Sequence, residues 1–172
     1  DGLEASVRAY IYDSWDPENP SSPWNMLNDK KFIFNDYTLE AERDPVTWKS
    51  AAAVTGSKMR VYAVSPYGFD LGDGIPTITH SVGTDPKTHK EVLVATTDVS
   101  KADYYNNVPL NFQHALTAVR FRMGFACSVE SIEIEGICTE GVYVLGSSDW
   151  TSSNEKTFTI SFPGGKSFDA GS

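Results

Sequence analysis

Residues 108–124 read VPLNFQHALTAVRFRMG, and the fold predicted for this chain depends on how that stretch is arranged. Apolar residues alternate with polar ones along it, but their parity changes: it is even up to Leu116 and odd from Val119. Because side chains alternate strictly between the two faces of a strand, one uninterrupted strand cannot bury both sets. We therefore predict a strand that is interrupted by a bulge or a short break near residues 115–118.

The same period of two recurs upstream of this stretch. Residues 92–99, VLVATTDV, are β-branched and almost uncharged, which predicts a strand buried on both faces. Residues 58–65, KMRVYAVS, predict a strand with its apolar face formed by Met59, Val61 and Ala63. Residues 32–40, FIFNDYTLE, predict a hairpin that turns at Asn35-Asp36, since both residue types tolerate a positive φ.

The chain begins with another alternating segment. Its polar positions are Ser6, Arg8, Tyr10 and Tyr12, which predicts a half-buried opening strand. The apolar positions of this strand are Leu3, Ala5, Val7, Ala9 and Ile11. Residues 13–23, DSWDPENPSSP, contain three prolines and are predicted to form a loop, because proline cannot donate to a sheet ladder.

Three more strands are expected downstream. Residues 131–137, SIEIEGI, alternate isoleucine with glutamate and should present one face to solvent, and strands are also predicted at residues 141–145 and 157–162. Residues 163–172 are rich in Gly and Ser and are interpreted as a linker or the start of a second domain, after a first domain of residues 1–162. About eight strands with loops of varied length predict an all-β protein, an antiparallel β-sandwich.

Composition excludes several classes of partner. The 172 residues carry a formal charge of −9, and no basic stripe is present to neutralise phosphates, so binding to nucleic acid or to an anionic membrane surface is not expected. No apolar run approaches the ~20 residues of a membrane-spanning helix. The two cysteines, Cys127 and Cys138, are interpreted as ordinary apolar residues, although a disulfide between them stays open.

Catalytic and metal-binding chemistry has little support in the sequence. The histidines are His80, His89 and His114, and none has a second ligand at a spacing that marks a metal site. His114 lies among apolar residues and is interpreted as a hydrogen-bonded core histidine. No nucleophile elbow, phosphate-binding loop or dinucleotide fingerprint occurs, and Gly72-Asp73-Gly74 is interpreted as a turn. We therefore expect neither an enzyme nor a cofactor.

Several large aromatic residues fall in predicted loops or at strand ends. They are Trp15, Trp24, Tyr104, Tyr105 and Trp150. Flat aromatic faces bury a large area at low entropic cost, so these residues are candidates for an adhesive patch or a platform that stacks sugars. The alternative is that they close the two ends of the sandwich, and the sequence leaves both interpretations open.

Residues 92–124 taken together resemble the signature of the fimbrillin family. An apolar strand with an alanine, a polar loop and a segment of the type L-x-F-x-H-x-L-x-x-V-x-F occur in the family's order. The matching residues are Leu93, Ala95, Leu110, Phe112, His114, Leu116, Val119 and Phe121. Upstream, Trp48 and the strand MRVYAVSPYG also resemble family features, so the resemblance covers about residues 32–150.

This resemblance implies a transthyretin-like antiparallel β-sandwich of seven to eight strands, usually the first of two such domains. It also implies export to the outer membrane of a Gram-negative anaerobe as a lipoprotein, and a role in a fimbria or pilus. In pilus-forming members a protease removes an N-terminal strand, and a strand from a neighbouring subunit fills the groove. Here the removable strand would be Leu3 to Ile11, and Arg8 and Arg43 are candidate points for trypsin-like cleavage.

Two functions from different classes follow. The first is a non-enzymatic structural subunit of a cell-surface fimbria, whose partners are other pilin subunits joined by strand addition. The second is a monomeric surface lipoprotein that acts in cell adhesion by binding a host or dietary glycan or a protein.

Overall fold

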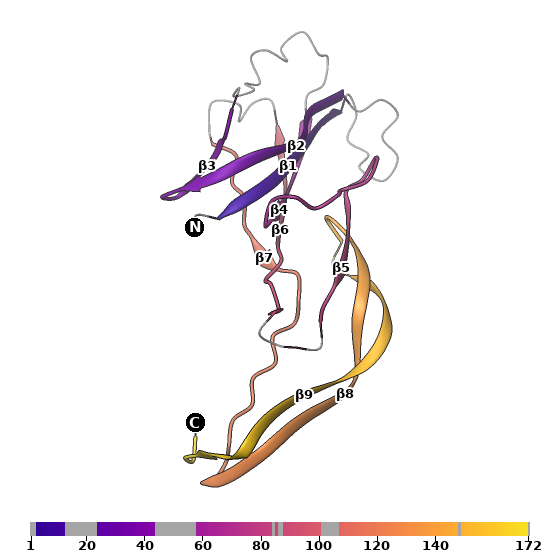
Figure 1. The fold of residues 1–172 in the computed structure, drawn as a ribbon. Coiled ribbons are helices and arrows are strands. Elements are labelled where there is room, and N and C mark those ends of the chain that lie inside the picture. Colours follow the sequence, from indigo (N-terminus) through magenta and orange to yellow (C-terminus); the bar gives the residue numbers. More distant parts are fainter. Residues whose placement is uncertain are drawn as a thin grey trace. The chain divides into compact units, whose positions relative to one another are not determined.

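The computed structural model describes residues 3–12, 24–43, 58–83, 85, 88–100, 107–147 and 149–171 (Figure 1). Within these residues there are nine strands and no α-helix. The strands are β1 (Glu4–Tyr12), β2 (Trp24–Asn35), β3 (Thr38–Ala41), β4 (Lys58–Ser65), β5 (Thr77–Ser81), β6 (Leu93–Ser100), β7 (Gln113–His114), β8 (Cys127–Val144) and β9 (Trp150–Phe168). The predicted loop at residues 13–23 lies outside the described residues.

The strands form two sheets. One is six-stranded in the order β3-β2-β1-β4-β6-β7, and the other is three-stranded in the order β5-β8-β9. Both are antiparallel, so the prediction of an all-β protein with the antiparallel sheets of a β-sandwich is confirmed.

The chain divides into two compact units. Unit 1 comprises Asp1–Ile78, Glu91–Ala115 and Tyr143–Asp149, and it contains the whole six-stranded sheet. Unit 2 comprises Thr79–Lys90, Leu116–Val142 and Trp150–Ser172, and it contains most of β8 and β9.

The prediction for residues 58–65 is confirmed by β4, which places Met59, Val61 and Ala63 together in the core of unit 1. The hairpin predicted at residues 32–40 is also confirmed, because β2 pairs with β3. Its turn lies one residue later than expected, at Asp36-Tyr37, where Asp36 has a φ of 52°.

Two expectations about burial need correction. The opening strand β1 was predicted to be half-buried, but Ser6, Arg8 and Tyr10 on its polar face are buried as well. The strand at β6 was predicted to be buried on both faces, yet only its first half is, because Thr96 and Asp98 are exposed. In both cases the burial of a strand face depends on which other segments pack against it. The alternation of residues along the strand does not contain that information.

The register break in residues 108–124 is larger than a bulge. Only Gln113 and His114 pair with β6, as the two-residue edge strand β7, and residues 115–126 form no strand. The predicted irregularity near residues 115–118 is therefore present, but the predicted strand does not resume after it. The chain passes from unit 1 to unit 2 at this break, between Ala115 and Leu116.

The strands predicted at residues 131–137 and 141–145 are one long strand, β8. Inward and outward side chains alternate along it with irregular steps at Glu130-Ser131 and Glu135-Gly136, and Gly136 has a φ of 68°. Irregular steps of this kind are typical of positions where a long strand bends and its twist increases. Cys127 and Cys138 are both free, and they lie eleven residues apart on this same strand, which is about 36 Å of extended chain, so they do not pair with each other.

The strand predicted at residues 157–162 is the central part of the longer strand β9. Within it Phe158, Ile160 and Phe162 are half-buried and alternate with exposed residues. The Gly- and Ser-rich residues 163–168 continue β9 in this structure, and Gly164 and Gly165 have φ values of 83° and 79°. Glycine adopts a positive φ at no steric cost, so the strand can continue through Gly164 and Gly165.

Candidate functional site

The site that the fold singles out is the position of β1 at the centre of the six-stranded sheet. On one side β1 pairs with β4 without interruption from Ser6↔Val64 to Tyr12↔Lys58. On its other side β1 pairs with β2 from Glu4↔Ile33 to Ile11↔Trp24. We call the space that β1 occupies between β2 and β4 the β1 slot. Both of its walls are main-chain edges that only β1 satisfies.

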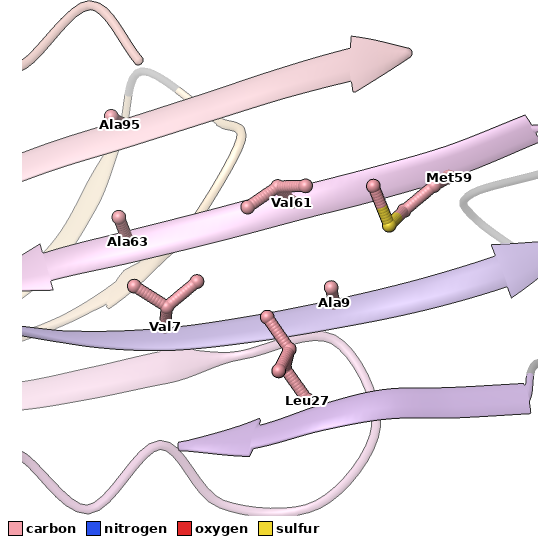
Figure 2. Close-up of a cluster of buried hydrophobic side chains, with 7 residues drawn as sticks. All are labelled: Val7, Ala9, Leu27, Met59, Val61, Ala63 and Ala95. Atoms are coloured by element: carbon pink, nitrogen blue, oxygen red, sulfur yellow. The ribbon is translucent and has the colours of Figure 1, made fainter. Parts of the chain in front are cut away.

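One face of the β1 slot is apolar (Figure 2). Val7 lies opposite Ala63 on β4, and Ala63 lies opposite Ala95 on β6, so the three form a row across neighbouring strands. Ala9 is fully buried between Leu27 and Val61. The full cluster is Val7, Ala9, Leu27, Met59, Val61, Ala63 and Ala95. Alanine occupies three of these buried positions, and a larger side chain at any of them would overpack the cluster.

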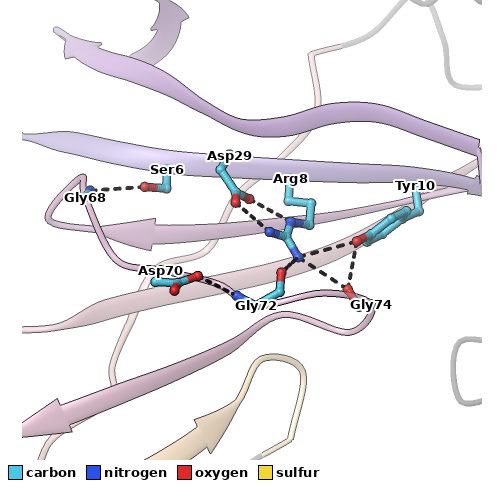
Figure 3. A network of polar contacts seen from close by, with 8 residues as sticks. All are labelled: Ser6, Arg8, Tyr10, Asp29, Gly68, Asp70, Gly72 and Gly74. Carbon is cyan, nitrogen blue, oxygen red and sulfur yellow. Dashed lines mark hydrogen bonds and ion pairs between the residues drawn. The ribbon is translucent and has the colours of Figure 1, made fainter.

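The other face of the slot is polar and is organised by Arg8, whose side chain is only 4% exposed (Figure 3). Its Nε donates to Oδ1 of Asp29 at 2.6 Å, and its Nη2 donates to Oδ2 of the same carboxylate. Its Nη1 donates to the carbonyl oxygen of Gly72 at 2.7 Å. Beside it, the Tyr10 hydroxyl donates to the carbonyl oxygen of Gly74 at 2.7 Å. A planar guanidinium suits such a set of acceptors because its N–H groups point in fixed directions.

An irregularity in β2 aims Asp29 at Arg8. Between the pairs Val7↔Lys30 and Ala9↔Leu27 the register shifts, so two residues of β2 lie opposite Arg8 alone. Asp29 has a φ of 51° there. Aspartate tolerates this left-handed conformation better than most residues, and bulges commonly redirect a side chain.

The loop after β4 is held against the same face. The Gly68 amide donates to the Ser6 hydroxyl at 3.3 Å, and the Gly72 amide donates to the Asp70 carboxylate at 3.0 Å. Gly72 and Gly74 have φ values of 62° and 73°, which agrees with the turn predicted at Gly72-Asp73-Gly74. The sequence did not indicate that the carbonyl groups of this turn would accept hydrogen bonds from β1.

Arg8 stays charged in this environment. Burial by itself would lower the pKa of its guanidinium, but the hydrogen bonds and the negative charge of Asp29 outweigh that effect and raise the pKa above its ordinary value. The β1 slot therefore holds a permanent buried cation that is matched by the Asp29 carboxylate and by the carbonyl oxygen of Gly72.

The structure brings part of the predicted strand-exchange segment together and leaves part undescribed. Ala5, Val7 and Ala9 are buried and Leu3 is half-buried, while the side chain of Ile11 lies outside the described residues. Asp29, Gly72 and Gly74, which complete the site, were not identified from the sequence. The one local signal was the Asn28-Asp29 pair within a strand, since both residue types tolerate a positive φ.

The family-signature residues are distributed between the two units. Ala95 is in the core, Leu110 and Phe112 pack partly against it, and Leu93 and Leu116 are half-buried. Val119 and Phe121 are exposed rather than in the core.

The interpretation of His114 as a core histidine is wrong. Its side chain is 70% exposed, and its Nδ1 lies 2.6 Å from Oε1 of Glu91. The reason is that β7 is a two-residue strand at the edge of its sheet, with β6 as its neighbour on one side.

The described part of the structure does not bring the candidate adhesive aromatic residues together. Trp15, Tyr104 and Tyr105 lie outside them, as does the side chain of Trp24. Trp150 is half-buried at the start of β9, and a Cβ atom added at Gly141 would come within 2.9 Å of its Cε3. Trp150 therefore packs on the backbone of β8 at Gly141.

Among the described residues, no three His, Cys, Asp or Glu side chains are grouped as a metal ion would require. In the same residues there is no helix with the length and apolar character needed to cross a membrane.

Because Arg8 is buried, we expect the folded chain to resist proteolysis after this residue. In the folded chain, an arginine-specific protease is expected to cut the Arg8–Ala9 bond more than about a hundredfold more slowly than in the urea-unfolded chain, because the bond becomes accessible only when β1 leaves the sheet. Arg43 is exposed just after β3 and should show much less protection. Mass spectrometry of timed digests measures both rates, and rapid cleavage after Arg8 in the folded chain would contradict the buried position of β1.

We expect His80 to make the free energy of unfolding depend on pH. It lies in β5, and burial lowers the pKa of its imidazole below the ordinary 6.5. The unfolded chain then binds a proton at a higher pH than the folded chain does, so the free energy of unfolding is expected to fall as the pH drops below about 6.5. In the His80→Gln variant this part of the loss should vanish. Urea unfolding of both proteins at about pH 7.5 and about pH 5.5 tests this, and an identical pH dependence would refute it.

Comparisons with known proteins concern the family and the fold of the chain. A family model described as fimbrillin-like matches residues 5–170. The crystal structure of a putative cell adhesion protein from Bacteroides uniformis is similar with a TM-score of 0.57 at 16% identity, over 94% of this chain and 64% of that one. This chain thus spans about two thirds of that structure's length, and at this identity the likeness concerns the fold. No curated protein is similar to the chain in sequence at a significant level.

Proposed function

Since this chain belongs to the fimbrillin-like family, which confirms the resemblance drawn from residues 92–124, we propose that it is a non-enzymatic subunit of a bacterial cell-surface fimbria. In this proposal the chain is exported, is anchored at the outer membrane as a lipoprotein before assembly, and is joined to neighbouring subunits by β-strand addition. The β1 slot supports the mode of assembly, and the family supports the surface role.

The observation that carries the proposal is that β1 alone connects the two halves of its sheet. Strands β3 and β2 lie on one side of it, and β4, β6 and β7 lie on the other. If Leu3 to Ile11 were removed, the main-chain edges of β2 and β4 would both lose their partner, and the apolar row at Ala63 would lose the cover of Val7. An extended segment from another subunit can restore the hydrogen bonds of both edges and that cover.

Strand addition at this position has a physical advantage over addition to an outer edge. An inserted strand gains two ladders of main-chain hydrogen bonds and is covered on both faces, as β1 is. Each net hydrogen bond contributes only about 1 kcal/mol, so two ladders and two buried faces are what make such a joint persistent.

Immunogold electron microscopy of cells that express the chain tests the fimbrial role. With antibody raised against the domain, gold is expected along thin filaments or at their ends. Gold that is scattered over the cell surface with no filament would refute the proposed role.

A further inference from the structure

We propose that two copies of this chain pair through unit 2, with residues 119–123 of one copy lying antiparallel beside residues 132–136 of β8 in the other. We call residues 119–123 the donor segment and residues 132–136 the β8 edge. The contact uses no residue of the β1 slot and is independent of the fimbrial role.

The donor segment has the pattern of a strand but belongs to no sheet of the described structure. Residues 119–125, VRFRMGF, place an apolar side chain at every second position, yet none of them is in a strand. Val119 is 58% exposed and Phe121 is 41% exposed. Large apolar side chains that alternate along an exposed segment indicate a surface that another chain covers.

The β8 edge has a strand on one side only. The neighbours of β8 in its sheet are β5 and β9, and β5 has five residues against eighteen in β8. The amide of Val82, directly after β5, donates to the carbonyl oxygen of Thr139 at 2.8 Å. Strand β5 therefore lies beside the last part of β8, and no described strand pairs with residues 127–138 on that side. Such an edge readily takes up a further strand.

The two segments carry opposite charges that have no partner of opposite sign within the described residues. Arg120 and Arg122 are exposed, and neither forms an ion pair with a described carboxylate. Arg122 contacts the carbonyl oxygen of Gly171, at 3.4 Å. Glu133 and Glu135 are likewise exposed on β8, and no described cation pairs with either.

One antiparallel register satisfies the apolar side chains. With Phe121 opposite Ile134, Met123 lies opposite Ile132, and both isoleucines are half-buried in unit 2. The donor segment then extends the apolar face of the β8–β9 sheet by one strand. A shift of one residue in either direction would place Phe121 opposite a glutamate, because the side-chain period of a strand is two.

The same register matches the charges. It sets Arg120 opposite Glu135 and Arg122 opposite Glu133 on the other face, and opposite charges directly across two strands stabilise a sheet. A shift of two residues in either direction leaves one arginine without a glutamate opposite it. Both faces therefore select a single register.

The donor segment cannot reach this register in its own chain while β8 is intact. Met123 is four residues from Cys127, the first residue of β8, so the two Cα atoms are at most about 14 Å apart. The position opposite Ile132 lies five residues along β8 from Cys127, which is about 17 Å. Only the donor segment of another copy can occupy it.

A tight hairpin within one chain fits the sequence less well. Pairing Met123 with Cys127 would set only Arg120 opposite a glutamate, Glu130. Its three-residue loop would place Ala126 where a positive φ is required, a conformation that favours glycine. In the structure, residues 115–126 form no strand.

The contact is reciprocal. Each copy has one donor segment and one β8 edge, so two copies that exchange donor segments form a closed pair with two identical contacts. We therefore expect a dimer.

Sedimentation velocity of the full chain at about 1 to 100 µM is expected to show monomer and dimer in equilibrium, with a dissociation constant of about 10 µM. The Arg120→Glu/Arg122→Glu variant and the Glu133→Arg/Glu135→Arg variant should each dimerise at least about thirty-fold more weakly, because like charges then face each other. All four positions are exposed, so the fold should be retained.

An equimolar mixture of the two variants should recover the dimer to within about threefold of the original affinity, since each donor segment then meets a β8 edge of opposite charge. The matched controls are Glu155→Arg and Lys156→Glu, at exposed positions of β9 outside the contact. Each should stay within about twofold of the original chain.

Hydrogen exchange of the peptide covering residues 117–125 gives a second measurement. Its amides should be protected at about 100 µM and unprotected at about 1 µM. Protection that is equal at both concentrations would mean pairing within one chain and would overturn the proposal. A chain that stays monomeric throughout, or variants whose mixture does not recover the dimer, would overturn it as well.

Discussion

Replacing Arg8 by alanine is expected to lower the free energy of unfolding of unit 1 by about 3 kcal/mol, since a buried ion pair that loses one partner leaves the other charge uncompensated. The Asp29 carboxylate is 31% exposed, so water relieves part of this cost, and we place the effect at the lower end of the usual range. The carbonyl oxygen of Gly72 would lose its donor at the same time.

A second arginine offers a matched control. Arg60 also contacts a carboxylate through two nitrogens, with distances of 2.6 and 2.7 Å to Asp98, but this pair lies at the surface and its carboxylate is 48% exposed. Exposed pairs contribute little, so Arg60→Ala should cost no more than about 1 kcal/mol. Urea unfolding measures both variants, and equal losses would contradict the special role assigned to Arg8.

Replacing Tyr62 by alanine is expected to cost about 3 to 5 kcal/mol, through lost burial and the cavity left behind. Tyr62 is only 1% exposed and lies opposite Arg8 in the β1–β4 ladder. Its ring meets that of Tyr10 edge to face, with 6.4 Å between the ring centres. The variant thus removes the aromatic support of the polar face of the β1 slot.

Two controls bracket the Tyr62 result. Tyr62→Phe keeps the ring and should cost about 1 kcal/mol or less, and Tyr37→Ala removes a tyrosine that is 96% exposed and should change stability by less than about 0.5 kcal/mol. Hydrogen exchange of the peptide covering residues 58–65 reports the opening of unit 1 itself. If Tyr62→Ala leaves that exchange unchanged, the packing described for β4 is not what stabilises unit 1.

Much of the strand content could be predicted because parity is a property of neighbouring residues. The alternation in residues 58–65 placed Met59, Val61 and Ala63 on one face, and the structure buries these three together. The parity change after Leu116 indicated an interruption, and the ladder to β6 ends just before it, at His114. This interruption could be predicted from a few neighbouring side chains, without knowledge of the fold.

The candidate site was only half visible in the sequence. The apolar positions of β1 followed from its alternation, whereas the role of Arg8 did not, because its partners are far away in the chain. Asp29 is separated from it by 21 residues and Gly72 by 64. His114 was misplaced for a related reason: its apolar neighbours suggested the core, but β7 is an edge strand.

The sequence by itself determined that this chain is all-β, where most strands lie, which faces are apolar, and, through the order of its signature residues, the family to which it belongs. Only the tertiary structure decided that β1 is central and covered on both faces, and that its arginine is matched by Asp29 and by a distant turn. The physical reason is that alternation records how a side chain relates to its neighbours along the strand, while burial and pairing depend on which other segment comes to lie over it.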